Sequence, residues 1–95
     1  MSGDEPHRDR RVRFTGASVE KFGKWAEAAS AEDFDLAGGV LLSVTDGTWR
    51  DTCEWHPDVF HPFIWHIVIR RGLILSLKFA QEYPGYVQLI YIGEP

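Results

Sequence analysis

The amino-acid sequence predicts an α+β domain, in which an N-terminal helix and a second short helix pack on an antiparallel meander of about five strands. Two observations favour this fold class. Helical periodicity is confined to the N-terminal part, whereas the later residues alternate apolar and polar side chains between turn signals. A chain of 95 residues is also too short for two hydrophobic cores. We expect a disordered tail over residues 1–10 and a single domain over residues 11–95.

The N-terminal third contains one short strand and two helices in this interpretation. Val12 and Phe14 alternate with arginines, which suits an edge strand. Ser18 is predicted to cap the first helix, because the apolar residues that follow it fall on one helical face: Val19, Phe22, Trp25, Ala26 and Ala29. Ser30 would start the second helix and Gly38-Gly39 would end it.

A first β-hairpin is predicted around Asp46-Gly47, between strands over residues 40–44 and 49–55. Asp-Gly between two alternating runs is typical of a type I′ turn, which requires positive φ at its central residues. A two-residue loop of this kind pairs Val44 with Trp49. The face that carries both residues is the one we expect to be buried.

A second hairpin follows in FIWHIVIRRGLILSLKF. The apolar residues of its two strands lie on the same face only if the loop has three residues, Arg70-Arg71-Gly72. Ile69 then pairs with Leu73. Gly72 then occupies the loop position that favours a positive φ. Pro84-Gly85 marks the next turn, and YVQLIYI supplies the last strand.

The charge distribution argues against nucleic acid as the partner and for a basic protein surface, or for no charged partner at all. The formal net charge is −4, and residues 14–62 carry nine acidic against three basic side chains. A nucleic-acid-binding domain needs a basic surface to neutralise phosphates. No apolar run is long enough for a membrane span or resembles a signal peptide, so we expect a cytoplasmic protein that binds no membrane. A single cysteine excludes an internal disulfide.

The segment CEWHPDVFHPFIWH raises the question of a metal site. Cys53, His56, His61 and His66 follow the spacing Cys-x2-His-x4-His-x4-His, which resembles a zinc knuckle, and zinc prefers thiolate and imidazole ligands. The predicted strands, however, place Cys53 and His66 on opposite faces of the sheet. The alternative is an extended connection bracketed by two His-Pro dipeptides, with Cys53 as a small core residue. We therefore predict no metal, no cofactor and no catalytic residues.

The second face of the predicted sheet is the candidate partner-binding surface. It would combine an apolar centre with a hydrogen-bonding rim, as protein interfaces do. Its expected rows are Thr52, His66 and Ser76; then Glu54, Ile64 and Lys78; then Arg50, Val68 and Ile74. The N-terminal tail or the strand at residues 12–14 could instead cover this face from within.

These observations predict a small acidic, non-enzymatic protein-binding module. An inhibitor, an immunity protein or an antitoxin-like partner of a basic protein surface fits this description. Two alternatives stay open. One is a subunit that forms a homo-oligomer, such as a homodimer, through the second sheet face, and the other is a metal-binding protein that uses the cysteine and the histidines.

Overall fold

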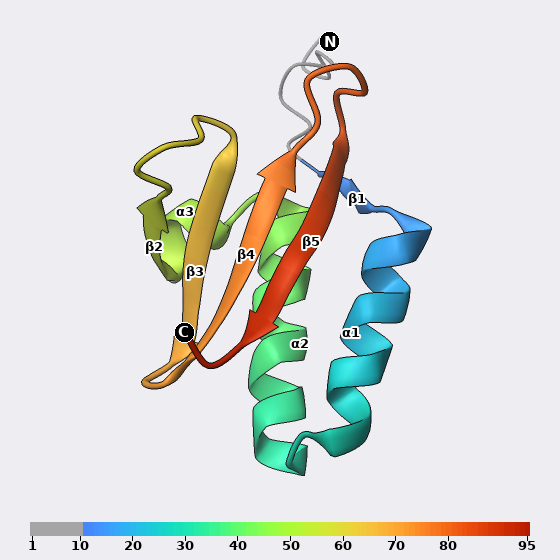
Figure 1. Cartoon of the computed structure of the whole chain (residues 1–95), viewed down its shortest axis with the longest axis vertical. Helices are drawn as coiled ribbons and strands as arrows, with labels where there is room; N and C mark the ends of the chain where they lie inside the picture. Colours follow the sequence, from blue (N-terminus) through green and yellow to red (C-terminus); the bar gives the residue numbers. More distant parts are fainter. Residues whose placement is uncertain (1–10) are drawn as a thin grey trace, which may run out of the picture.

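The computed structural model describes residues 11–95, which form five strands and three helices (Figure 1). The helices are α1 (Gly16–Ala28), α2 (Ala31–Asp46) and α3 (Trp49–Thr52). The strands are β1 (Arg13–Phe14), β2 (Glu54–Pro57), β3 (Ile64–Arg70), β4 (Leu73–Phe79) and β5 (Tyr86–Gly93). This arrangement confirms the predicted α+β class. The tail expected over residues 1–10 lies outside the described residues.

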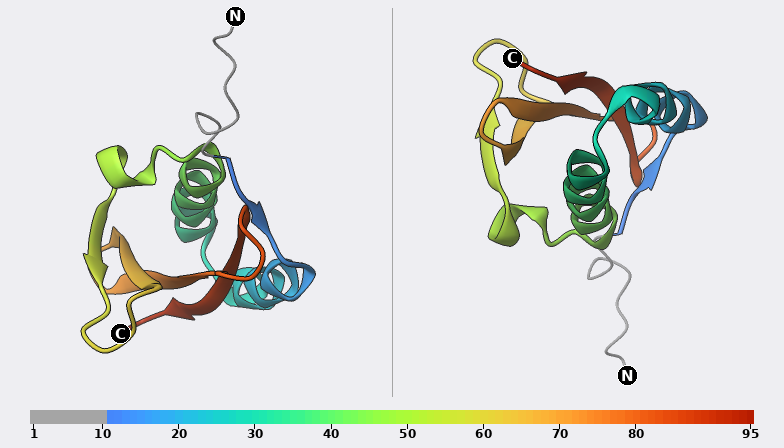
Figure 2. Two further views of the ribbon diagram at one scale, coloured as in Figure 1. Left: turned by 90° about the horizontal axis from the view of Figure 1, so that it is seen from above. Right: turned by 90° about the horizontal axis from the view of Figure 1, so that it is seen from below.

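The five strands form one curled sheet with the order β1-β5-β4-β3-β2. Strands β2 to β5 are an antiparallel meander, and β1 pairs in parallel with β5 at the opposite edge from β2. The sheet wraps around α2, which lies on its concave side, while α1 runs beside β5 (Figure 2). The Ser18 hydroxyl accepts a hydrogen bond of 2.8 Å from the amide of Leu89, which fixes α1 to that edge. No helix of residues 11–95 covers the convex side.

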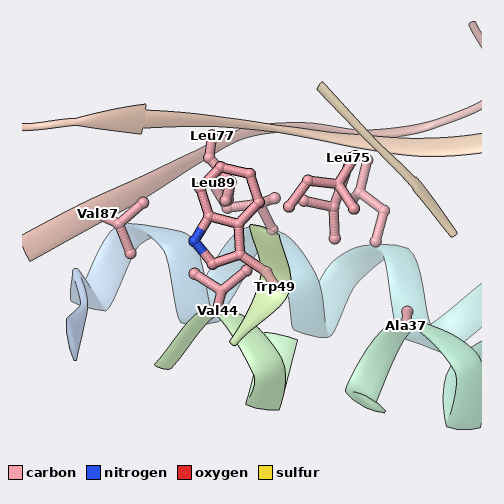
Figure 3. Close-up of a cluster of buried hydrophobic side chains, with 9 residues drawn as sticks. Ala37, Val44, Trp49, Leu75, Leu77, Val87 and Leu89 are labelled. Carbon is pink, nitrogen blue, oxygen red and sulfur yellow. The ribbon is translucent and has the colours of Figure 1, made fainter. Parts of the chain in front are cut away.

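The hydrophobic core fills the concave side (Figure 3). Trp49 lies between Val44 of α2 and the buried leucines of the sheet. Its ring stacks on Phe79 with centroids 5.9 Å apart and meets Trp55 and Trp65 edge-on. These aromatic contacts anchor the single turn of α3 to the sheet, although a four-residue helix has almost no stability of its own.

The predicted hairpin around Asp46-Gly47 is wrong, because residues 31–46 form one helix. Ala37, Leu41 and Val44 recur at helical spacing and pack into the core, which holds the helix together across Gly38-Gly39. Gly47 adopts φ 79° and donates its amide to the carbonyls of Ser43 and Val44, so Asp-Gly here is a helix C-cap. A type I′ turn and a helix C-cap both favour a glycine with positive φ at this position. The prediction that Gly38-Gly39 end the second helix is also wrong, because α2 continues through them to Asp46.

Two further boundaries differ from expectation. The strand predicted over residues 49–55 is divided into α3 and β2. Helix α1 begins after Thr15 rather than Ser18, because the Thr15 hydroxyl accepts the amide of Ser18 and frees the Ser18 side chain for Leu89. The predicted cap at Ser30 is confirmed, since its hydroxyl accepts a hydrogen bond of 3.0 Å from the amide of Asp33.

The register of the β3–β4 hairpin is confirmed over most of its length. Val68 lies opposite Ile74, and Gly72 has a φ of 83° as predicted. At the turn a bulge places Arg70, instead of Ile69, opposite Leu73. Arg70 then reaches the first turn of α2, where its guanidinium donates to both carboxylate oxygens of Asp33 at 2.7 and 2.9 Å. This hydrogen-bonded pair holds the pKa of the Asp33 carboxyl below its ordinary value.

Candidate functional site

Most of the predicted partner-binding residues lie on the convex face of the sheet. They are Glu54, Ile64, His66, Val68, Ile74, Ser76 and Lys78. Arg50 and Thr52 do not belong to this face, because α3 replaces the strand that was expected to carry them. Arg50 instead lies over the rings of Trp49 and Trp65, at 4.9 and 4.7 Å from their centroids. The Thr52 hydroxyl donates to the carbonyl of Thr48 within the helical turn.

The rows across the convex face also differ from prediction. Glu54 lies opposite Val68 rather than Ile64, a shift of four residues, and His56 takes the place beside His66 that Thr52 was expected to fill. The shift arises because β2 continues to Pro57 and the amide of Asp58 donates to the carbonyl of Ile64 at 2.9 Å. An even shift leaves each strand residue on its predicted face.

The convex face has a partly exposed apolar centre. Ile64, Val68 and Ile74 are half-buried, and Ile90 and Tyr91 of β5 extend the apolar surface with 37% and 44% exposure. Glu54 and Lys78 are its exposed charges. Strand β1 does not cover the face, because it pairs with β5 at the sheet edge. The other cover considered from sequence, the tail, lies outside the part of the chain that the structure describes.

His66 links the convex face to the loop over residues 58–63. Its Nδ1 lies 2.6 Å from the Ser76 hydroxyl, and its Nε2 lies 2.8 Å from Oδ1 of Asp58. The other oxygen of Asp58 accepts the amides of Phe60 and His61, each at 3.0 Å. The hydrogen bond from His66, together with these amides, lowers the pKa of the Asp58 carboxyl from its ordinary value. The loop is therefore fixed to the sheet by a charged hydrogen-bonding group.

Asp58, His66 and Ser76 are the residue types of a hydrolase triad, but their arrangement suits anchoring better than catalysis. A nucleophile must contact its substrate, and Ser76 is only 3% exposed beneath its neighbours. The apolar cleft described below lies at the end of the sheet, and Ser76 does not line it. The three side chains are therefore best explained as a latch that positions the loop.

Two loops at the same end of the sheet expose several large apolar side chains (Figure 1). Val59 and Phe60, in the loop between β2 and β3, are 87% and 85% exposed. Tyr83 and Tyr86, which flank the loop between β4 and β5, and Phe63 are also exposed. We call these five residues the loop-end cluster. A cleft of about 580 Å³ opens beside them, with Phe63, Phe79, Tyr83 and Tyr86 in its wall and Lys78 and Glu82 among its polar groups.

The four histidine and cysteine residues of the metal hypothesis do not converge. Cys53 lies 3.5 Å from the Ser43 hydroxyl, His56 pairs with Glu54, and His66 is directed at Ser76 and Asp58. Among residues 11–95, no group of three or more His, Cys, Asp or Glu side chains could hold a metal ion.

Comparison with known proteins finds no matching family model, no matching curated protein and no matching solved structure. None of the three helices between residues 11 and 95 has the length and apolar character needed to cross a membrane.

Proposed function

We propose that this domain is a small non-enzymatic protein-binding module that presents the convex face of its sheet to another protein. One observation supports this function above the others. The helices pack on the concave side, yet the convex side carries Ile64, Val68 and Ile74 where an open antiparallel face is normally polar. An apolar centre bordered by Glu54 and Lys78 has the composition of an interface rather than of ordinary surface.

The charge of the domain favours a partner with a basic surface. Residues 11–95 carry eleven acidic against eight basic side chains. Exposed acids lie on α2 and α3, including Asp35, Asp46 and Asp51, beside rather than on the convex face. Such charges act at long range, so they would accelerate association with a basic protein and matter less once the complex has formed. An inhibitor, an immunity protein or an antitoxin-like partner would use a surface of this kind.

The test compares a substitution on the convex face with a matched substitution elsewhere. The immobilised wild-type domain should retain a binding partner from an extract of the cells in which it naturally occurs, and immobilised Val68→Arg should not retain that partner. Leu42→Arg, at a position of α2 that is 62% exposed, introduces the same side chain away from the face and should retain it. The free energy of unfolding of both variants should stay within about 0.5 kcal/mol of the wild-type value, as is usual for surface substitutions.

Two outcomes would contradict the proposal. In one, a specific partner binds wild type and Val68→Arg equally well. In the other, no protein is retained by the wild-type domain at low ionic strength, where an electrostatically guided complex forms fastest. A second candidate, a homo-oligomer through the same convex face, is supported by the apolar extension at Ile90 and Tyr91. It would appear as a wild-type dimer that Val68→Arg dissociates.

A further inference from the structure

We infer that the loop end is a homodimer contact, in which the Val59–Phe60 tip of one copy enters the aromatic cleft of a second copy. Two-fold symmetry then forms the same contact in the opposite direction. The contact is centred on the loop end, which meets the convex face only at its border, where Lys78 also lines the cleft. It does not depend on the function proposed above.

The tip is a fixed protrusion. Asp58 accepts the amides of Phe60 and His61 and is itself held by His66, which in turn bonds Ser76 in the middle of the sheet. Val59 and Phe60 nevertheless remain 87% and 85% exposed. Because the loop is already ordered, little conformational entropy is lost when these side chains enter a partner. Large apolar side chains that are exposed on a backbone fixed in this way are typical of binding sites.

The cleft provides a complementary receptor. Its volume of about 580 Å³ lies within the range of ligand-binding pockets and admits an aromatic side chain. The rings of Phe79, Tyr83 and Tyr86 line it, and aromatic rings pack favourably edge-on or offset against another ring. Phe63 belongs both to the cleft wall and to the residues that follow the tip, so the protrusion and the receptor are neighbours on one end of the molecule.

Neighbouring protrusion and receptor surfaces favour a second copy as the occupant. A two-fold axis between them satisfies both at once and closes the assembly at two chains, whereas a different protein would need its own protrusion and its own cleft. The exposed fractions of the loop-end cluster correspond to about 480–640 Å² per copy at about 150–200 Å² for each side chain. Two copies would bury about 960–1,280 Å², a range that includes the lower limit of about 1,200 Å² for specific interfaces and fits a weak dimer.

Pairing of sheet edges offers a poorer route to a dimer. The outer edge strand β2 has only four residues, and one of them is Pro57, which has no amide proton to donate. The opposite edge is occupied, because β1 and α1 both bond to β5. The loop end is therefore the apolar surface best suited to self-association.

The mass of the full chain, measured by sedimentation equilibrium over a range of concentrations, tests this inference. Wild type should be a monomer–dimer equilibrium. Phe60→Ser, which removes the protrusion, and Tyr83→Asp, which alters the cleft at a side chain 68% exposed, should each raise the dissociation constant by about ten-fold or more. Val19→Ser, on α1 and 63% exposed, is the matched control and should leave the dimer unchanged.

A mixture of the two variants separates this geometry from other contacts. Each variant alone has two damaged contacts per dimer, whereas the mixed dimer has one intact contact, formed by the tip of Tyr83→Asp and the cleft of Phe60→Ser. Mixing should therefore restore association. Failure of the mixture to associate more strongly than either variant would overturn the inference, as would a monomeric wild type or a mass that grows beyond two chains. A dimer that Val68→Arg dissociates and Phe60→Ser does not would assign the contact to the convex face instead.

Discussion

Replacing Gly38 and Gly39 by alanine tests the largest departure of the structure from the sequence-based expectation. Both glycines lie in the interior of α2, and neither has a positive φ. A β-carbon built at either position meets nothing within 4 Å beyond the helix itself. Alanine is favoured over glycine in a helix by about 1 kcal/mol, mainly because glycine has more freedom to lose on folding. The double variant should therefore be more stable than wild type by about 1–2 kcal/mol.

This gain corresponds to a rise in melting temperature of about 4–16 °C for a domain of this size. Urea unfolding followed by tryptophan fluorescence measures the gain in free energy directly, since Trp49 is buried beside Val44 of α2. Gly47→Ala is the matched control: its φ of 79° is unfavourable for alanine, so the same change should cost about 1 kcal/mol. A double variant that is less stable than wild type would show that residues 38 and 39 are not in a helix interior and would refute this account of α2.

Two further predictions concern acid and metal. Hydrogen bonding lowers the pKa of Asp33 and of Asp58 in the folded state. Each carboxylate therefore stabilises the fold above the unfolded-state pKa of about 3.9, and this contribution is lost as the pH falls through the lower folded-state pKa. The free energy of unfolding should therefore drop between about pH 5 and pH 3. The drop should be less steep in Asp33→Asn than in the control variant Asp35→Asn. If the free energy of unfolding falls equally steeply with pH in both variants, the stabilising role of the Asp33–Arg70 pair is contradicted. Purified protein should contain no stoichiometric zinc and should melt at the same temperature with and without a chelator. One zinc ion per chain that is lost in Cys53→Ser would instead support the metal-binding alternative.

The β3–β4 hairpin could be predicted because two independent constraints agree there. The apolar residues on both strands must share one face, which requires either a three-residue loop or, as observed, a two-residue turn with a bulge. Gly72 then falls at the loop position that needs its positive φ. The pattern could not predict the bulge at the turn or the contact that Arg70 makes there with Asp33, a residue far away in the chain.

The C-terminal half of α2 was missed because its sequence satisfies two periodicities at once. Val40, Leu42 and Val44 alternate as in a strand, while Ala37, Leu41 and Val44 recur as in a helix. Valine and glycine are weak helix formers, so local propensity favoured the strand. The packing of α2 inside the curled sheet decides for the helix, and it leaves Leu42 exposed on the side away from the core.

Part of the candidate site could be predicted from the alternation of apolar and polar residues. Alternation along β3 and β4 placed Ile64, Val68 and Ile74 together on one face, and that placement survives the four-residue shift of β2. The loop-end cluster has no periodic signal, because its residues come from two separate loops. Asp58 before an apolar pair, between two His-Pro dipeptides, is the one local sign that the loop is ordered by its own side chain.

The latch formed by Asp58, His66 and Ser76 connects the two surfaces proposed here. His66 lies within the convex face, yet its hydrogen bond to Asp58 also fixes the loop that carries Phe60. A change at any latch residue would therefore disturb both surfaces, and loss of binding in such a variant could not be assigned to either one. Val68→Arg and Phe60→Ser leave the latch intact and alter one surface each, which is why these two substitutions can separate binding of another protein from dimerisation.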